Sequence, residues 1–272
     1  MSYNKGVHVR PKTDENSDLN ATADLSTTLI RGLEVLQCFS NDDRALSNAE
    51  ISKRLGMNRP TVSRLCKTLV HVGFLRRDAK GMFRLAPNLL SLAYPCLSAM
   101  SWRHATTDLM NEVAEMTGGS ITMSVMSGDR FVQIKTAGEK DGYPHVPEIG
   151  LNGPLLRSST GRALLSLLDG PELTEKLEEL SLSDPAGYEE TRELTHQGIE
   201  QCRVQGFCVS HGEWRSNIVA AATPLGCTED GLLVALACGM PRFRVHAGQF
   251  EADIGPRLAS VADALRSKGL FV

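Results

Sequence analysis

The hydrophobic pattern near the N-terminus has a helical period, then becomes that of two short strands. Apolar side chains recur at every third or fourth position in three segments, as in helices that share a core. We expect these helices at 27–39, between Ser47 and Gly56, and between Asn58 and Gly73. The segments 74–77 and 82–85 flank a four-residue turn and predict a β-hairpin.

The second and third predicted helices carry recognisable capping residues. Ser47 precedes the second helix and Glu50 follows three positions later, which is the spacing of a capping box. Gly56 supplies the turn that ends this helix. Asn58 caps the third helix and Pro60 lies in its first turn, where a missing N–H costs nothing. Two helices joined by a tight turn and followed by a hairpin predict a winged helix-turn-helix domain over 26–86.

The third helix has one apolar face and one polar, basic face. Its inward positions are Val62, Leu65, Cys66 and Leu69. Its outward side chains fit the major groove of DNA, and the hairpin and the start of the second helix fit the phosphates. The residues expected to bind DNA are Ser47, Arg59, Thr61, Ser63, Arg64, Lys67, Arg76, Arg77 and Lys80.

The charge distribution supports this interpretation. Residues 44–84 hold ten Lys or Arg against two acidic residues, a net charge of +8. The whole chain has a net charge of −3, so all other residues together carry −11. A basic module on an acidic body is typical of a protein whose head binds a polyanion, here double-stranded DNA. For any single arginine, a solvated surface charge is the alternative.

Bulk properties limit the other classes of protein. The 272 residues have room for two domains, and no apolar segment is long enough to span a bilayer. Residues 1–25 lack the apolar core of a signal peptide and predict a disordered arm of a cytoplasmic protein. The seven cysteines show no CxxC spacing, which favours buried, reduced thiols; a redox pair of Cys202 and Cys208 is the alternative. We expect no cofactor, no metal and no membrane contact.

Beyond the hairpin, the pattern predicts a linker helix over 87–99 and an α+β domain over 100–272. Pro95 is expected to end a short helix, and a longer helix is expected to run from there to Thr117. A hairpin is expected around Gly128 and Asp129, and the Gly/Pro-rich loop 138–155 is interpreted as a ligand-contact segment. The remaining expected helices are 159–168, 171–180, 189–205 and 245–268, and the expected strands are 120–127, 130–137, 207–211, 218–224 and 232–238.

Several of these segments, in this order, resemble the IclR family of bacterial transcription regulators. The head has S-x-x-E-I-x-x-x-L-G-x-x-x-x-T-V-x-R-L over 47–65, G-F-L at 73–75 and F-R-L at 83–85. The body has S-S-T-G-R-A-L-L-S over 158–166, Glu213 with A-A-T-P-L at 221–225, and a last strand that leads to Arg244. The resemblance covers about 25–269. It implies a GAF-like effector-binding domain, and homodimers or homotetramers on a palindromic operator.

The resemblance also implies an effector site between the sheet and the loop 138–155. Relatives that bind small oxoacids have an acid near Ser210, a cysteine near Ala220 and serines near Ala237 and Gly239, and this chain has none of these. We therefore expect a roomier site for an organic acid with a larger apolar or aromatic part, with help from Trp214; for the methionines, ordinary sheet core is the alternative. The residues expected to bind the effector are Ser159, Thr160, Ser210, Ala220, Ala237, Gly239, Met123 and Met126.

Two other classes of function were weighed. An enzyme is disfavoured because the sequence lacks the GxSxG, HExxH, Walker and GxGxxG motifs. A structural DNA-bridging protein predicts binding that is indifferent to sequence and to ligands, whereas a regulator protects one palindrome and responds to its effector. The sequence favours the regulator and leaves open whether it represses or activates, and which acid it senses.

Overall fold

The computed structural model describes residues 25–40, 43–138 and 148–271. The chain divides into two compact units between Ala99 and Met100. The loop interpreted as a ligand-contact segment lies partly outside the described residues, since 139–147 are not among them.

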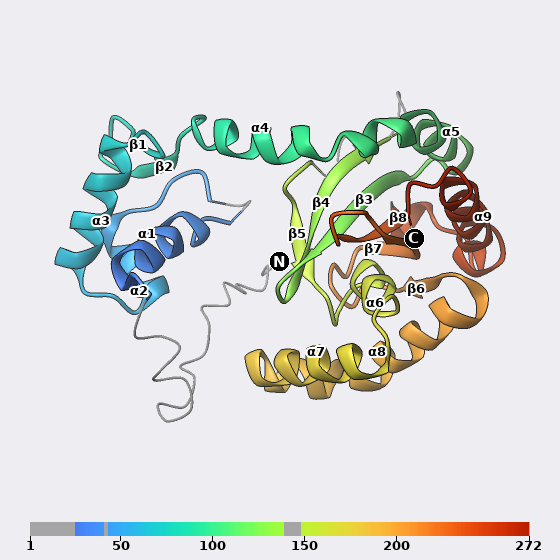
Figure 1. The fold of residues 1–272 in the computed structure, drawn as a ribbon. Coiled ribbons are helices and arrows are strands. Elements are labelled where there is room, and N and C mark those ends of the chain that lie inside the picture. Colours follow the sequence, from blue (N-terminus) through green and yellow to red (C-terminus); the bar gives the residue numbers. More distant parts are fainter. Residues whose placement is uncertain (1–24, 41–42, 139–147, 272) are drawn as a thin grey trace. The chain divides into compact units, whose positions relative to one another are not determined.

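In its described residues the first unit contains a head of three helices and a small hairpin, followed by the helix α4 (Leu89–Ala99; Figure 1). The bounds are α1 (Thr27–Gln37), α2 (Asn48–Leu55), α3 (Arg59–His71), β1 (Leu75–Arg77) and β2 (Phe83–Leu85). Leu46 pairs with Phe83 through both backbone hydrogen bonds, at 2.9 and 2.8 Å, so the segment before α2 extends the hairpin. The helical core predicted from the spacing is confirmed, with Val62, Leu65, Cys66 and Leu69 all buried.

The predicted capping residues are also confirmed. The Ser47 hydroxyl accepts from the Glu50 N–H, and the Glu50 carboxylate accepts from the Ser47 N–H at 2.7 Å. Gly56 ends α2 in the left-handed region at φ 63°, a conformation that favours glycine. The Asn58 side chain accepts from the Thr61 N–H at 2.9 Å at the start of α3. Local sequence therefore sets both ends of the turn between the two helices.

The helix α4 (Leu89–Ala99) differs from the expectation, because Pro95 lies in its interior instead of ending it. A proline there removes one helical hydrogen bond, which leaves the Ser91 carbonyl without its usual donor. All but two of the residues of α4 are exposed and none is buried, so water can solvate that carbonyl. The long helix expected up to Thr117 is instead interrupted at Met100, whose ψ of 50° is not helical. A 3-10 helix η1 (Ser101–Thr106) and α5 (Thr107–Thr117) follow.

The second unit is built on a six-stranded antiparallel sheet of order β5-β4-β3-β8-β7-β6. The predicted hairpin of β3 (Ser120–Ser127) and β4 (Arg130–Ala137) is confirmed, as are the three later strands, whose bounds shift by a few residues. The short strand β5 lies where only loop was expected, because its backbone pairs with the edge of β4. The remaining strands are β5 (Asn152–Pro154), β6 (Cys208–Ser210), β7 (Ile218–Cys227) and β8 (Leu233–Pro241).

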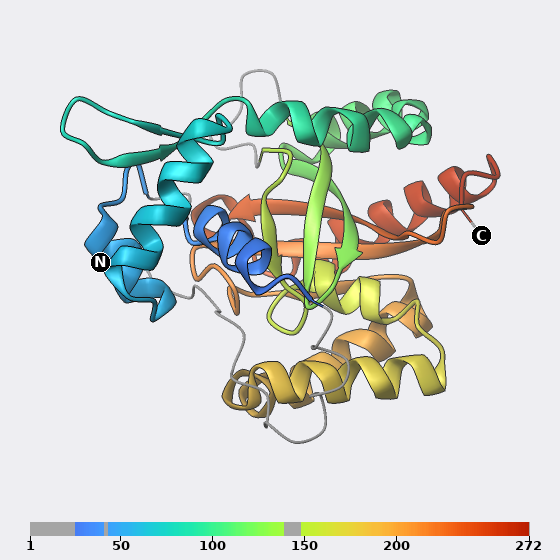
Figure 2. The same ribbon diagram turned by 60° about the vertical axis from the view of Figure 1, so that its left-hand side comes forward.

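Helices cover both faces of this sheet (Figures 1 and 2). α5 lies on the face of Cys238, whose thiol is 3.8 Å from the Thr117 hydroxyl, and α9 (Gly255–Arg266) packs against β7 and β8. On the other face, α6 (Ser159–Leu165) lies against the strands, and α7 (Gly170–Ser183) and α8 (Pro185–Gln205) lie outside it. These two helices start earlier than predicted, at their caps Asp169 and Asp184.

The last predicted helix, 245–268, is not continuous. The chain forms a 3-10 turn at Arg242–Arg244, a π-helical segment at Phe250–Ile254, and only then α9. The Phe207 ring lies so close to Gly255 that a Cβ there would be 2.1 Å from it. We relate the π-helical segment to this close approach, which helical periodicity does not reveal.

Candidate DNA-binding surface and effector site

The outward face of α3 presents a row of basic side chains. Arg59, Arg64 and Lys67 are exposed, while Thr61 and Ser63 are half-buried at the edge of the same face. No ion pair joins these three basic side chains to another described residue. Their charges are therefore available to phosphates or base edges.

The hairpin adds a second basic surface. Arg76, Arg77 and Lys80 are exposed, and Arg76 lies opposite Arg84 in the strand register. The Arg77 guanidinium lies 4.7 Å from the centre of the Phe83 ring, which holds the side chain over its own strand partner.

Two basic residues of the head serve the fold. The Asp43 carboxylate accepts from both terminal nitrogens of Arg54, one at 2.8 Å, and Arg54 also donates to the Cys38 carbonyl at 2.9 Å. This hydrogen bonding holds the pKa of Asp43 well below its usual range. Arg84 pairs with Asp78 at 3.1 Å across the turn. Sequence counting treated both arginines as part of the basic excess, because ion-pair partners this far apart leave no periodic signal.

Ser47 is used mainly in the capping box described above, where its hydroxyl and its N–H are both engaged by Glu50. It remains half-buried at the start of α2. A contact from Ser47 to a DNA phosphate would have to share this hydroxyl with the cap. Sequence reasoning assigned both roles to Ser47 without this competition.

In the second unit, two predicted effector residues meet directly. The Ser210 hydroxyl, at the end of β6, donates to the Ser159 hydroxyl at the start of α6 at 3.2 Å. Both side chains are buried, and the Cys208 thiol donates to the Ser159 carbonyl at 3.4 Å. Thr160 follows Ser159 on α6 and is also buried. The α6–β6 junction therefore groups three hydroxyls, which are suitable partners for a carboxylate.

The strand register places four further predicted residues on the same face of the sheet. Ser210 pairs with Ala220, and Ala220 pairs with Gly239. Ala237 lies two residues from Gly239 on β8 and so shares its face. Met126 shares this face through the alternation of β3, whose Thr122 pairs with Ala237. The side chains here are small, apart from Met126, and α6 packs against β7 and β8.

Met123 does not belong to this group. It pairs with Leu236 in β8, one position out of phase with Ala237, and so faces the opposite side of the sheet. It is fully buried there, on the side of Cys238 and α5. The alternative weighed for the methionines, ordinary sheet core, is the one that fits Met123. A one-residue phase difference along the strand decides this, since Met123 shares its face with Ile121 and Val125.

Sequence reasoning missed two polar side chains on the face that carries Ala220 and Ala237. Ser124 and Gln133 are cross-strand partners and are both buried. The Ser124 hydroxyl and the side-chain Oε1 atom of Gln133 have no hydrogen-bond partner among the described residues. Buried polar atoms are normally satisfied, so an unpaired neighbouring pair is suited to a polar group that enters from outside the chain. Their alternation with apolar neighbours in β3 and β4 was the only available signal.

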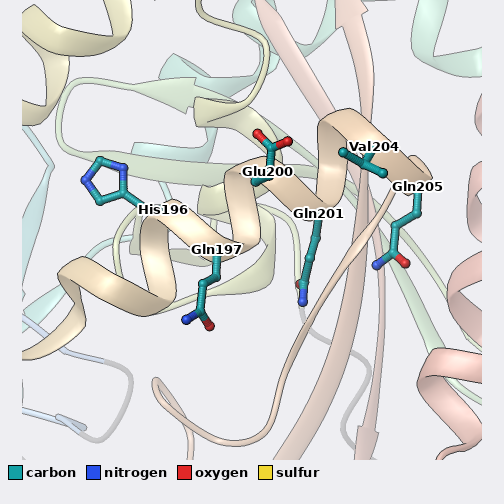
Figure 3. Close-up of a pocket in the computed structure, with 6 residues that line it drawn as sticks. All are labelled: His196, Gln197, Glu200, Gln201, Val204 and Gln205. Carbon is teal, nitrogen blue, oxygen red and sulfur yellow. The ribbon is translucent and has the colours of Figure 1, made fainter.

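Two hollows recorded in the described part of the chain lie along α8, away from Ala220 and Gly239. The larger, of about 540 Å³, is lined by six residues of α8 alone, and their side chains fan outward from that helix (Figure 3). A hollow walled by a single helix is open surface, so it is not a ligand site. The smaller, of about 180 Å³, lies between α8, Arg162 of α6 and the segment after β6.

Comparison with known proteins identifies the family. The profile described as IclR helix-turn-helix domain matches residues 28–79, and that of the bacterial transcriptional regulator IclR C-terminal domain matches 95–266. The chain belongs to the IclR family. The resemblance proposed from the sequence is thereby confirmed, with its α+β fold and its helix-turn-helix head. As an IclR-family protein, the chain is a DNA-binding transcription regulator and not an enzyme.

Relatives and solved structures agree with this assignment. The Pca regulon regulatory protein of Pseudomonas putida is 27% identical over 88% of this chain and 82% of its own length. The p-hydroxybenzoate hydroxylase transcriptional activator of Acinetobacter baylyi is 26% identical over 90% and 93%. The crystal structure of an IclR family transcriptional regulator from Brucella abortus is 32% identical, covers 95% of this chain and 96% of its own, and has a TM-score of 0.79.

A further IclR homologue, from Microbacterium hydrocarbonoxydans, was crystallised as a complex with 4-hydroxybenzoate. It is 19% identical, covers 89% of this chain and 98% of its own, and has a TM-score of 0.65. At this identity it shows the shared fold. Among the described residues of our IclR-family chain, no helix has the length and apolar character needed to cross a membrane.

Proposed function

We propose that this regulator binds a palindromic operator as a homodimer or homotetramer and changes its affinity when a small organic acid binds the second unit. One observation carries the proposal that an acid binds the second unit. On the sheet face of Ser210, Ala220 and Gly239, a hydroxyl group that contacts Ser159 lies beside small apolar residues. Residues 26–86 are the proposed DNA-binding domain, 87–99 the linker, and 100–272 the effector-binding domain. The cytoplasm is the proposed location, where bacterial DNA is accessible.

Unpaired apolar surfaces in the first unit support self-association. The helix α4 has no charged residue and no buried residue, and its Leu90 and Tyr94 are both 72% exposed within the chain. On α1, Leu29 and Leu33 are also largely exposed. Apolar helices of this kind need a cover, and a second copy of the chain supplies an identical one. A two-fold dimer reads a palindrome, because each head then meets an equivalent half-site.

An aromatic acid is our proposed effector class. Ala220, Ala237 and Gly239 present little side-chain bulk to a ring, and the hydroxyls of Ser159 and Ser210 suit its carboxylate. The Phe131 and Trp214 rings, 5.4 Å apart in an edge-to-face contact, border the same side of the sheet. The names of the Acinetobacter and Microbacterium relatives support this class, since both refer to hydroxybenzoate.

Footprinting of the promoter next to its own gene, with and without 4-hydroxybenzoate, tests the proposal. We expect protection of one inverted repeat, affinity that falls steeply with salt, and a change of about 5- to 150-fold when the acid binds. Pyruvate serves as the small-acid control. Uniform coverage of unrelated DNA, with no response to either acid, would instead support a structural DNA-bridging protein.

A further inference from the structure

We propose that the pair of buried Arg162 and half-buried Glu213 positions Trp214 as a wall of the effector site, and thereby sets its preference for aromatic acids. Arg162 and Glu213 act on the ligand through Trp214, so both are positioning residues. The inference rests on the proposed function, because it assumes an effector on this face of the sheet.

Arg162 is unusually enclosed for an arginine. It is 2% exposed and lies between α6 and α8, where Gly198 makes room for it: a Cβ at Gly198 would be 2.5 Å from the Arg162 Cδ. Its Nε donates to the Leu156 carbonyl at 3.3 Å. A guanidinium this deep in the protein requires a negative partner nearby.

That partner is Glu213, on the segment that joins β6 to β7. The Arg162 Nη1 and Glu213 Oε1 atoms are 3.8 Å apart, close enough for strong attraction but longer than a hydrogen bond. The Arg162 Nη2 and Glu213 Oε2 atoms are buried without a hydrogen-bond partner among the described residues. Charge therefore holds the segment against α6 without fixing it in one hydrogen-bonded position.

Trp214 directly follows Glu213 and extends to the far strands. Its ring meets Phe131 of β4 at 5.4 Å and 90°. It also approaches β5 so closely that a Cβ at Gly153 would be 2.7 Å from the Trp214 Cη2. Phe131 pairs with Met126 in the register, on the face that carries Ala237 and Gly239. The position of Glu213 thus decides where an aromatic wall stands over that face.

The short helix α6 carries both Arg162 and Ser159, and Ser159 belongs to the hydroxyl end of the proposed site. Ser159, which contacts Ser210, lies three residues before Arg162 on α6. A ligand that displaces Ser159 or presses on Trp214 therefore changes the Arg162–Glu213 separation. The pair links the hydroxyl end of the site to its aromatic end.

The test uses full-length protein with Trp102→Phe, which leaves Trp214 as its only tryptophan. The variant is Glu213→Gln. The matched control is Glu251→Gln, which removes a charge from the same small hollow, where Glu251 pairs with His211 at 2.9 Å and not with Arg162. Acrylamide quenching of Trp214 and affinities for 4-hydroxybenzoate and pyruvate are measured on each protein. If Glu213→Gln unfolds the second unit, Glu213→Asp is used as the variant instead.

We expect Glu213→Gln to increase the quenching of Trp214 and to weaken 4-hydroxybenzoate binding about three- to tenfold, the range of one aromatic contact. Pyruvate affinity and the Glu251→Gln control should not change. Unchanged quenching, or an equal loss for both acids, overturns the inference and leaves the proposed function standing. If the protein without Glu213→Gln binds neither acid but still binds its operator, the proposed effector class is wrong. In that case the change in Trp214 quenching on Glu213→Gln still tests whether Glu213 positions Trp214.

Discussion

The candidate functional residues of the first unit lie on its surface, whereas most of those of the second unit lie in its interior. In the head, the candidate residues are exposed on α3 and the hairpin, and the core behind them is ordinary helix packing. In the body, the candidate residues other than Met123 face inward, between the sheet and α6, and most of them are buried. An exposed function is specified by charge, whereas an enclosed one is specified by size, by strand phase and by unpaired polar atoms. The two should therefore respond to different substitutions.

Charge reversal on α3 should have the largest effect. Arg64→Glu replaces a proposed base or phosphate contact by repulsion, and we expect operator affinity to fall on the order of 100-fold. Arg192→Glu on α8 makes the same charge change on an exposed surface of the body. Binding is measured by gel shift over a range of salt concentrations. Equal losses in both variants would indicate a long-range charge effect and contradict a specific role for Arg64.

Asp43→Asn should destabilise the head by about 1–3 kcal/mol, because it leaves Arg54 without its charged partner. Hydrogen bonding from Arg54 lowers the folded-state pKa of Asp43, so the stabilisation is present above the unfolded value near ~4 and is lost as pH falls below it. Thermal unfolding at pH 7 and pH 3 measures this, with Asp129→Asn in the body as control. The difference between variant and parent should shrink at pH 3; a difference independent of pH would exclude the ion pair as its cause.

The head and the body also differ in how far the sequence predicts their structure. Capping residues and helical spacing were enough for α2, α3 and the hairpin, since those signals lie within a few residues of one another. Pro95 was misjudged because its helix is exposed and tolerates one missing hydrogen bond. Met123 was grouped with Met126, although the alternation of β3 places Met123 with Ile121 and Val125, and its pairing with Leu236 shows which side of the sheet that face is on. The Ser124–Gln133 pair needed the register of two strands before it could be recognised.

Ala220→Leu tests the enclosed site. The Ala220 side chain is half-buried on the effector face, and a leucine there would occupy the space proposed for the ring. We expect affinity for 4-hydroxybenzoate to fall about tenfold, the equivalent of ~1.4 kcal/mol, with operator binding unchanged in the absence of acid. Met123→Leu is the control, since it changes a side chain on the opposite face. If Met123→Leu lowers the affinity for the acid as much as Ala220→Leu does, the assignment of the effector to one face of the sheet is wrong.

Gly239→Ala should give the smallest effect and the sharpest distinction between stability and binding. A Cβ at Gly239 would lie 3.7 Å from the Ile218 Cγ2, an ordinary contact, so we expect the unfolding free energy to change by less than about 0.5 kcal/mol. One added methyl group in the space proposed for the ligand should lower the affinity for 4-hydroxybenzoate about fourfold, the equivalent of ~0.8 kcal/mol. Gly161→Ala is the contrasting variant, because its Cβ would lie 2.0 Å from the Leu155 carbonyl oxygen and should destabilise the body itself. Calorimetry of unfolding and of acid binding on both variants separates the two effects. If Gly239→Ala leaves acid affinity unchanged while the protein stays stable, then β8 does not border the ligand at this position.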